Sequence, residues 1–447
     1  MISVPVKKGY ALHIAGKPSQ EVETLEKPDS VALLPEKIPF IKPRLKITVG
    51  DKVNIGSTVF EDKRNPDIKF VSPGGGEITD IHFGPRRTIK KIVVTLDHEE
   101  AFENFSALDE TQIKSVEKSE LIKTILSAGL WPLLRQLPFR DIADPNFTPP
   151  AIIVGLNSIE PFHPSPNIYL KEKAELFDYG INILKRLSDT IIVSTSSKNF
   201  SDLDTFNGYV THLCKGPYPA DDPGVLVYHI KIDPAQNKSW FISGQDVLLL
   251  AGLLKTGKYP IERTVTVGGV LAPEKKHFLT RAGAPLGPLI QGQTIDEETA
   301  RYIVGGIFRG YASTFDSYVG FYETSLLVIP RGIEKEFLGF IRPGFNRPSR
   351  SRAFLSYFNP SDLPMDATYH GEERACVNCG YCTDVCPVDI LPQFTYKSIL
   401  ADEIEEALAH GLLDCVECGL CSYVCPSKIE LFDVLKNTKR AYYLEQF

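Results

Sequence analysis

Two cysteine runs near the carboxyl end constrain this chain more than any other feature. The first reads CVNCGYCTDVCP from position 376, and the second reads CVECGLCSYVCP from position 415. In both, the cysteines follow the spacing C-x2-C-x2-C-x3-C, and a proline comes directly after the last one. This doubled pattern is typical of proteins that hold two [4Fe–4S] clusters.

The spacing also predicts which cysteine binds which cluster. A cubane has four iron corners that each need a thiolate, and three cysteines three residues apart can wrap three corners. The short loop does not reach the fourth corner, which therefore takes the last cysteine of the other run. The predicted ligands are Cys376, Cys379, Cys382 and Cys425 for one cluster, and Cys415, Cys418, Cys421 and Cys386 for the other. Gly380 and Gly419 lie between ligands, where backbone N–H groups can approach sulfur.

Two other uses of clustered cysteines fit less well. Structural zinc usually takes two separated C-x2-C pairs, whereas each run here adds a third cysteine at the same step and a fourth before proline. Disulfide frameworks are typical of secreted proteins, and the opening MISVPVKKGYALHIAG lacks the uninterrupted apolar core of a signal peptide. The ninth cysteine, Cys214, is predicted to be a packing residue. We therefore expect a protein of a reducing compartment, the cytoplasm.

The composition argues against several partners. The chain has 447 residues, enough for roughly two to four domains. Its net charge of −7 argues against nonspecific binding to nucleic acid. No apolar run approaches the length of about 18 residues that a transmembrane helix needs, so none is predicted.

Local patterns divide the chain into segments and predict an α+β multidomain protein. The predicted segments are 1–104, a barrel-sandwich-like β domain; 105–235, a Rossmann-like α/β domain; 236–330, a β-grasp domain of SLBB type; 331–370, a basic connector; and 371–447, a helical ferredoxin domain with both clusters. In the first segment Lys63 is a candidate for a modified carrier lysine. The stretch RNPDIKFVS between Lys63 and Pro73 is too long for that role.

The α/β segment is predicted from a helix at 119–128, strands at 151–157 and 190–195, and a helix at 171–187. It contains no G-x-G-x-x-G. Gly252, Gly257 and Lys258 match part of a P-loop, but Tyr259 stands where Mg²⁺ coordination needs Ser or Thr. The preceding stretch GQDVLLLAGLLKTG is helical in pattern, so a helix end and a turn are predicted here instead of a phosphate loop.

The last third of the chain mixes charge runs with helices. Residues 331–352 carry six Lys or Arg against two Glu, which fits docking to an acidic face or to anionic lipid, and fits a solvated linker equally well. Between the cysteine runs one amphipathic helix is predicted, with Gly411 as its end. Its apolar positions are Tyr396, Ile399, Leu400, Ile404, Ala407 and Leu408. A final helix is predicted at 429–443.

Several phrases together resemble one family. They are KKGYALHIAGKPSQ, VFEDKRNPDIKFVSP, GLWPLLRQLPF, CKGPYPADDPG and RPGFNRPSRSRAFLSYF, and they span most of the chain. They are similar to the NqrA subunit of the Na⁺-translocating NADH:quinone oxidoreductase (Nqr), whose relatives are the RnfC subunit of the Rnf complex and the flavin-carrying subunit of complex I. The eight-cysteine tail is Rnf-like, because well-known NqrA proteins have lost most of these cysteines.

The resemblance implies a peripheral subunit on the cytoplasmic face of the inner membrane. Its implied partners are the membrane and flavin-carrying subunits of the same complex, with a quinone as acceptor of the whole complex. Its own role would be electron transfer through two clusters, with no catalytic acid, base or nucleophile. The alternatives are an Rnf-type subunit and a non-redox assembly subunit with structural clusters.

Where the complex I and Rnf relatives carry a Gly-rich loop for flavin and nucleotide, this chain has Gly129, Leu130, Trp131 and Pro132. Bulky side chains at this place should keep a phosphate away from the backbone. We therefore expect no FMN or NAD site in this chain.

Overall fold

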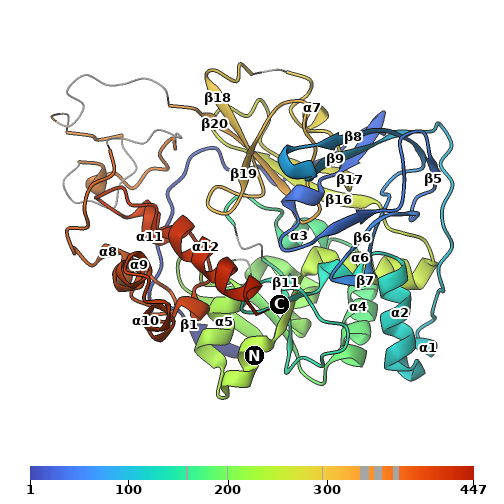
Figure 1. Cartoon of the computed structure of the whole chain (residues 1–447), viewed down its shortest axis with the longest axis horizontal. Coiled ribbons are helices and arrows are strands. Elements are labelled where there is room, and N and C mark those ends of the chain that lie inside the picture. Colours follow the sequence, from blue (N-terminus) through green and yellow to red (C-terminus); the bar gives the residue numbers. More distant parts are fainter. Residues whose placement is uncertain are drawn as a thin grey trace.

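The fold is taken from a computed structural model (Figure 1), which describes residues 1–157, 160–198, 200–293, 295–332, 341, 343–346, 355–365 and 372–446. Most of the basic connector predicted at 331–352 lies outside these residues. The described residues form four β-sheets, followed by a helical segment at the carboxyl end. No helix among them is long and apolar enough to cross a bilayer.

Two small antiparallel sheets make up the N-terminal β domain. One has the strand order β3 (Ser30–Leu33), β9 (Ile89–Leu96), β8 (Gly76–Phe83), β5 (Lys52–Val53), and the other the order β4 (Pro43–Leu45), β6 (Thr58–Asp62), β7 (Asn65–Val71). Phe60 and Phe70 stack with ring centroids 4.5 Å apart, and both are fully buried. Burial of large aromatic side chains is what holds such small sheets together.

The hairpin that contains Lys63 docks onto the next domain. Lys63 and Arg64 form the turn between β6 and β7, and the Arg64 guanidinium pairs with Asp62 and with Asp141, the latter at 2.6 Å. Burial opposes its charge, but the hydrogen bonds to the two carboxylates outweigh this and raise the pKa of Arg64. The tip is therefore fixed against the α/β domain.

A seven-stranded sheet is the centre of the α/β domain. Its order is β1 (Ile2–Pro5), β14 (His212–Lys215), β13 (Ile191–Ser196), β12 (Ile152–Gly155), β15 (Trp240–Ser243), β10 (Arg135–Gln136), β11 (Asp141–Ile142). The first five strands are parallel, and β10 is antiparallel to both of its neighbours, β15 and β11. All four residues of β12 are buried, as expected for a parallel strand covered on both faces.

Helices cover both faces of this sheet. They are α1 (Gln112–Ser115), α2 (Lys118–Ser127), α3 (Pro166–Tyr169), α4 (Ala174–Leu187), α5 (Pro223–Ile230) and α6 (Gly244–Thr256). Helices α4 and α6 pack together on one face, and α5 covers the other, where Cys214 is buried as predicted. The partial P-loop match is indeed the end of α6, since Gly257 caps it in the left-handed conformation at φ 67°.

Three strands and one helix fall outside the predicted segment boundaries. Strand β1 extends the α/β sheet, and β2 (Val22–Thr24) pairs with β17 (His277–Arg281) in the third domain. Strand β15 pairs in parallel with β12, so β15 and α6 belong to the α/β domain, which extends to Thr256 and not to 235. Pairing partners far away in the chain decided these boundaries, and local patterns do not report them.

The third domain is a mixed six-stranded sheet. Its order is β19 (Tyr311–Ser313), β18 (Ala300–Val304), β20 (Ser325–Pro330), β16 (Glu262–Gly268), β17, β2, with the short helix α7 (Leu286–Leu289). Its own apolar core includes Phe278 and Tyr302. In Figure 1 this sheet lies at the top, beside the N-terminal β domain.

The carboxyl-terminal segment repeats itself at an offset of 39 residues. Helices α8 (Tyr381–Asp384) and α9 (Pro392–Leu400) correspond to α11 (Leu420–Tyr423) and α12 (Leu431–Leu444). The single helix predicted in the insert is wrong: α9 ends at Leu400 and α10 (Ile404–Ala409) begins a new helix. Between them Asp402 has a left-handed φ of 61°, and Leu400 is 65% exposed instead of buried.

Candidate functional site

The two cysteine runs surround two separate cavities. We call residues 376–382 the first cysteine loop and residues 415–421 the second. The first-loop cavity is lined by Cys376, Cys379 and Cys382 together with Cys425 and Pro426 from the end of the other run. The second-loop cavity is lined by the cysteines of its own loop and by residues from the end of the first run. These are Cys415, Cys418, Cys421, Cys386 and Pro387, and Cys382 lines this cavity as well as the first.

Each cavity contains all four cysteines of one predicted set, including the last cysteine of the other run, and Cys382 is shared by both cavities. Among the described residues, no three His, Cys, Asp or Glu side chains lie close enough together to share a single metal ion. The cysteines line the walls of the two cavities instead. Their role as cluster ligands stays a prediction at this point.

The backbone shapes both loops in the same way. Asn378 and Glu417, at equivalent positions of the repeat, are left-handed with φ of 55° and 57°. Gly380 and Gly419 follow with φ of 79° and 76°. Non-glycine residues seldom adopt this conformation, so its repetition indicates that each loop is wound around the space inside it.

Backbone N–H groups point at the sulfur atoms. Cys386 receives such hydrogen bonds from Val388 and Ile390, and Cys418 receives one from Leu420. Burial raises the pKa of both thiols to about 12, so these sulfurs would not ionise alone at neutral pH. Bound cations would reverse this, because a coordinating thiol is deprotonated outright. Four thiols per cavity with backbone donors are therefore a donor set that fits an iron–sulfur cluster.

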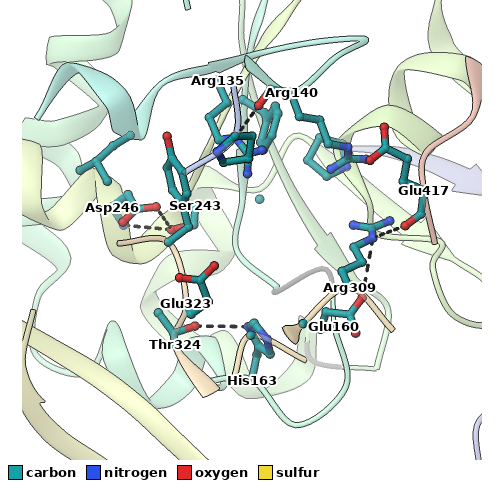
Figure 2. Close-up of a pocket in the computed structure, with 18 of the residues that line it drawn as sticks. Arg135, Arg140, Glu160, His163, Ser243, Asp246, Arg309, Glu323, Thr324 and Glu417 are labelled. Carbon is teal, nitrogen blue, oxygen red and sulfur yellow. Dashed lines mark hydrogen bonds and ion pairs between the residues drawn. The ribbon is translucent and has the colours of Figure 1, made fainter. Parts of the chain in front are cut away.

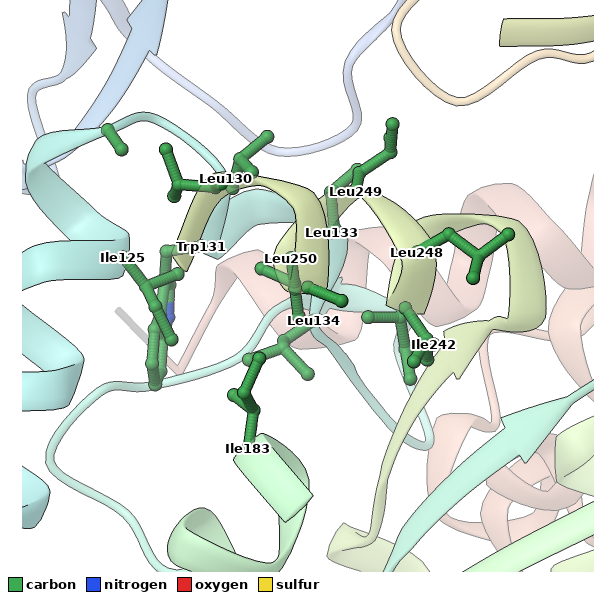
Figure 3. Close-up of a cluster of buried hydrophobic side chains, with 14 of the residues drawn as sticks. Ile125, Leu130, Trp131, Leu133, Leu134, Ile183, Ile242, Leu248, Leu249 and Leu250 are labelled. Carbon is green, nitrogen blue, oxygen red and sulfur yellow. The ribbon is translucent and has the colours of Figure 1, made fainter. Parts of the chain in front are cut away.

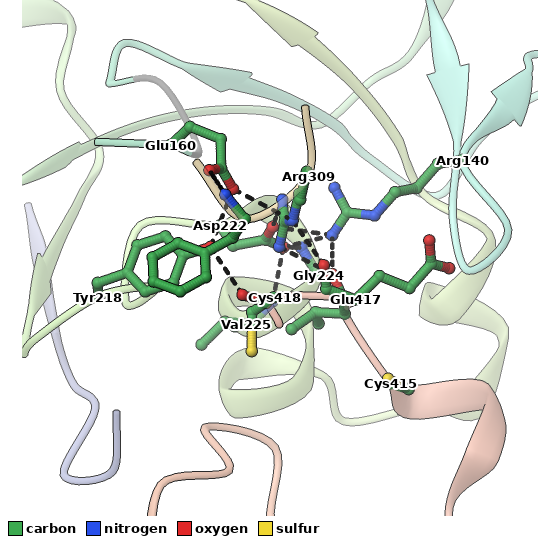
Figure 4. A network of polar contacts seen from close by, with 12 residues as sticks. Arg140, Glu160, Tyr218, Asp222, Gly224, Val225, Arg309, Cys415, Glu417 and Cys418 are labelled. Atoms are coloured by element: carbon green, nitrogen blue, oxygen red, sulfur yellow. Dashed lines mark hydrogen bonds and ion pairs between the residues drawn. The ribbon is translucent and has the colours of Figure 1, made fainter. Parts of the chain in front are cut away.

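A buried polar network holds the second loop against the upstream domains (Figure 4). Arg309 donates to the carbonyl oxygens of Glu417 and Val416, both at 2.8 Å, and Arg140 donates to the Val416 carbonyl at 3.2 Å. From α12, Lys439 donates to the Cys415 carbonyl at 2.6 Å and is 1% exposed. We call Arg140, Arg309 and Lys439 the cation clamp.

Asp222 balances two members of the cation clamp. Its carboxylate pairs with Arg140 at 2.7 Å and with Arg309 at 2.8 Å, and it is fully buried. Burial alone would raise its pKa, but the two guanidinium groups outweigh this and hold the pKa of Asp222 below its ordinary value. Asp222 also caps α5 by accepting the N–H of Gly224. One carboxylate therefore fixes a helix end and the two arginines at once.

Sequence analysis missed these network residues. They come from β10–β11, the start of α5, the third domain and α12, so no local motif unites them. The Asp-Pro pair before α5 predicts a helix cap, and that signal points to Asp222 but not to its arginine partners.

The segment after α2 is an apolar plug (Figure 3). Leu130, Trp131 and Leu133 are almost fully buried, and they pack with Leu249 and Leu250 of α6. The Trp131 indole donates to the Ala143 carbonyl at 2.7 Å. These side chains point into the core, as their bulk predicts.

A larger cavity of about 470 Å³ lies between the domains (Figure 2). Residues of the N-terminal β domain, the α/β domain, the third domain and α12 line it. Arg135, Glu323 and Arg440 are among them, and Glu417 and Phe432 line both this cavity and the second-loop cavity. No sequence motif marks it, because its walls come from segments that lie far apart in the chain.

Family models match three parts of the chain. Residues 4–97 match the NqrA N-terminal barrel-sandwich hybrid domain, 116–259 the NqrA second alpha/beta domain, and 375–429 the 4Fe-4S dicluster domain. The fold and the cysteine cavities thus define a multidomain iron–sulfur protein with a ferredoxin-like carboxyl end.

Curated relatives match nearly the whole chain. The NqrA subunits of the Na(+)-translocating NADH-quinone reductase from Histophilus somni (strain 2336) and Pasteurella multocida are 31% and 30% identical, each over 92% of both chains. The chain belongs to this NqrA family. A solved NAD+-reducing [NiFe]-hydrogenase is similar over 49% of this chain and 47% of that one, at 11% identity and a TM-score of 0.32, too weak a likeness to bear on function.

Proposed function

We propose that this chain is a peripheral, cytoplasmic-face subunit of a Na⁺-translocating NADH-quinone reductase and that it carries two [4Fe–4S] clusters. The family membership supports the complex, and the grouping of eight cysteines around two cavities supports the clusters. When bound, a [4Fe–4S] cluster accepts and releases one electron. The chain supplies the thiolates, keeps water from the second-loop cavity by burial, and donates backbone N–H groups to sulfur.

The exchanged cysteines give the sharpest test. Anaerobically prepared protein should contain about eight irons and give two EPR signals after reduction. Cys425→Ser should remove the signal of the first-loop cluster, and Cys386→Ser that of the second-loop cluster. Cys214→Ser is the matched control, because Cys214 is buried in a separate apolar cluster and should leave eight irons. Colourless protein that holds zinc instead would contradict the proposal.

A structural role for the clusters is the second candidate. The observation that favours it is the insertion of the second loop between domains, where Tyr218 also donates to the Cys418 carbonyl at 3.0 Å. Cys415→Ser separates the candidates. Lost quinone reduction in an assembled complex supports electron transfer, and lost assembly supports the structural role.

The finer family assignments are part of the proposal. We propose a Rossmann-like α/β domain without a flavin or nucleotide loop, because the plug after α2 occupies that place. We propose a β-grasp, SLBB-like third domain, an Rnf-like tail, and docking to the membrane subunits. Tight FMN or NADH binding by the isolated protein would favour the Rnf-type alternative.

A further inference from the structure

The 470 Å³ cavity lies at a particular point of the α/β sheet. Gly155 and Asn157 follow β12, and Ser243 and Asp246 follow β15, so the cavity sits at the carboxyl ends of two adjacent parallel strands. From β12 the chain builds β13 and β14 on one side and then returns to β15 on the other. Open α/β sheets bind ligands at such a switch point, where two loops diverge.

The backbone does not offer a phosphate loop here. Ser243 caps α6 by accepting the N–H of Asp246, and the Asp246 carboxylate lies at the same helix end. A Cβ added at Gly244 would come within 2.5 Å of the Tyr169 hydroxyl, so the approach to the first turn is filled. Any anion in this cavity must therefore be recognised by side chains.

Arg135 is the side chain placed for that task (Figure 2). Its guanidinium lies over the rings of Tyr322 and Phe241, at 4.6 and 5.4 Å from the centroids, and its Nε donates to the Arg140 carbonyl at 2.8 Å. Within the described chain its terminal nitrogens make no hydrogen bond or ion pair. Burial lowers the pKa of Arg135 although Glu417 and Glu323, which also line the cavity, act to raise it, so an anion in direct contact would relieve a charge that is only partly balanced.

Helix α12 adds two more cations at the cavity. Phe432, Lys436 and Arg440 recur at four-residue steps and so share one face of the helix. Lys436 lies over the Phe432 ring at 5.1 Å and Arg440 over the Phe40 ring at 5.5 Å, and neither has an ion pair among the described residues. The cavity thus combines aromatic walls with unpaired positive charge. Its volume falls within the range of about 300–1,000 Å³ typical of small-molecule sites.

We propose that this cavity binds a small molecule that has a flat ring system and an acidic group, with the carboxylate or phosphate against Arg135 and the ring against the aromatic walls. The ring lies beside Glu417 and Phe432, which also line the second-loop cavity. The site goes beyond the proposed electron transfer and does not depend on it, because recognition rests on charge and shape.

Calorimetric titration of the anaerobic full-length protein with three naphthalene probes tests the site. Both 1-naphthoate and 1-naphthyl phosphate should bind at one saturable site, more tightly than the neutral 1-naphthamide. The acid that binds more tightly then shows whether the site prefers a carboxylate or a phosphate group. Arg135→Met should weaken the acids by roughly tenfold or more and leave the amide unchanged, because it removes charge-assisted hydrogen bonds.

Two further variants keep the test decisive. Arg440→Met changes an exposed side chain, so the fold should keep its stability. This variant should weaken the binding of both acids by a factor of a few. Arg301→Met, on the exposed side of β18, is the matched control and should bind like the wild type. No saturable binding of either acid, or unchanged acid binding in Arg135→Met and Arg440→Met, would overturn the proposal.

Discussion

The two cysteine loops share one spacing and one backbone shape, but their surroundings differ. Val377 of the first loop is 68% exposed, whereas Val416, the same residue type at the equivalent position of the second loop, is 5% exposed. The second loop is held by the cation clamp through its carbonyl oxygens, and Cys379 of the first loop is exposed to solvent. Closely similar local sequence therefore yields one loop open to solvent and one loop built into the molecule.

This difference has an electrostatic consequence. Reduction adds a negative charge to a cluster, so nearby cations raise its potential. The clamp brings three cations to the second loop, partly balanced by Asp222 and Glu417. The equivalent of Lys439 in the first half of the repeat is Leu400, which carries no charge. The two clusters proposed here should therefore respond differently to charge changes at matched positions.

Removing the charge of Asp222 should have the largest effect. Asp222→Asn keeps a side chain able to cap α5, but it leaves the buried Arg140 without its ion-pair partner and Arg309 with only the more distant Glu160, at 3.7 Å. The loss should be about 3–5 kcal/mol of unfolding free energy, measured by urea denaturation followed at the cluster absorbance.

The control for Asp222 lies at the end of the first cysteine run. Asp389 is half exposed and pairs with Lys8 at 2.7 Å. Asp389→Asn should cost less than about 1 kcal/mol, because solvent screens the pair. Equal costs in the two variants would mean that the two loops are held alike.

Lys439→Met should lower the potential of the second-loop cluster. Loss of one buried charge a few ångströms away corresponds to roughly 50–100 mV for a one-electron couple. EPR-monitored redox titration should show this shift in one signal only. If both signals move equally, or neither moves, Lys439 does not act on one cluster in particular.

Substitutions of the two loop glycines test how crowded the equivalent positions of the two loops are. Gly380→Ala and Gly419→Ala both force a left-handed conformation on a side chain, at about 1–2 kcal/mol each. An added Cβ meets open space at Gly380 but comes within 3.2 Å of Phe308 at Gly419. Thermal unfolding should therefore show the larger loss for Gly419→Ala. The reverse order would place the tighter packing at the first loop.

Leu400→Lys should have the smallest effect. It places a cation in the first half of the repeat where Lys439 stands in the second. Because Leu400 is 65% exposed, solvent screens the new charge, and the first-loop potential should rise by less than the Lys439→Met shift. Leu400→Gln, of similar length and no charge, is the control and should leave the potential unchanged.

The sequence by itself determined the features that depend on neighbours in the chain. The cysteine spacing alone predicts two sets of thiols, because a short loop closes on itself regardless of the rest of the fold; each predicted set lines one cavity, and Cys382 lines both. The bulky residues after α2 are buried in the core, as their size predicts. Gly257 ends a helix, as its place after an apolar helical pattern predicts.

Only the tertiary structure decided what depends on distant partners. Strand β1 joined the α/β sheet and β2 the third sheet through pairings more than 200 residues away. The insert helix broke at Asp402, although its apolar positions fit one continuous face. Arg140, Arg309 and Asp222 converge on the second loop from segments that share no pattern, because contacts between domains depend on how the whole chain packs and leave no periodic trace in the sequence.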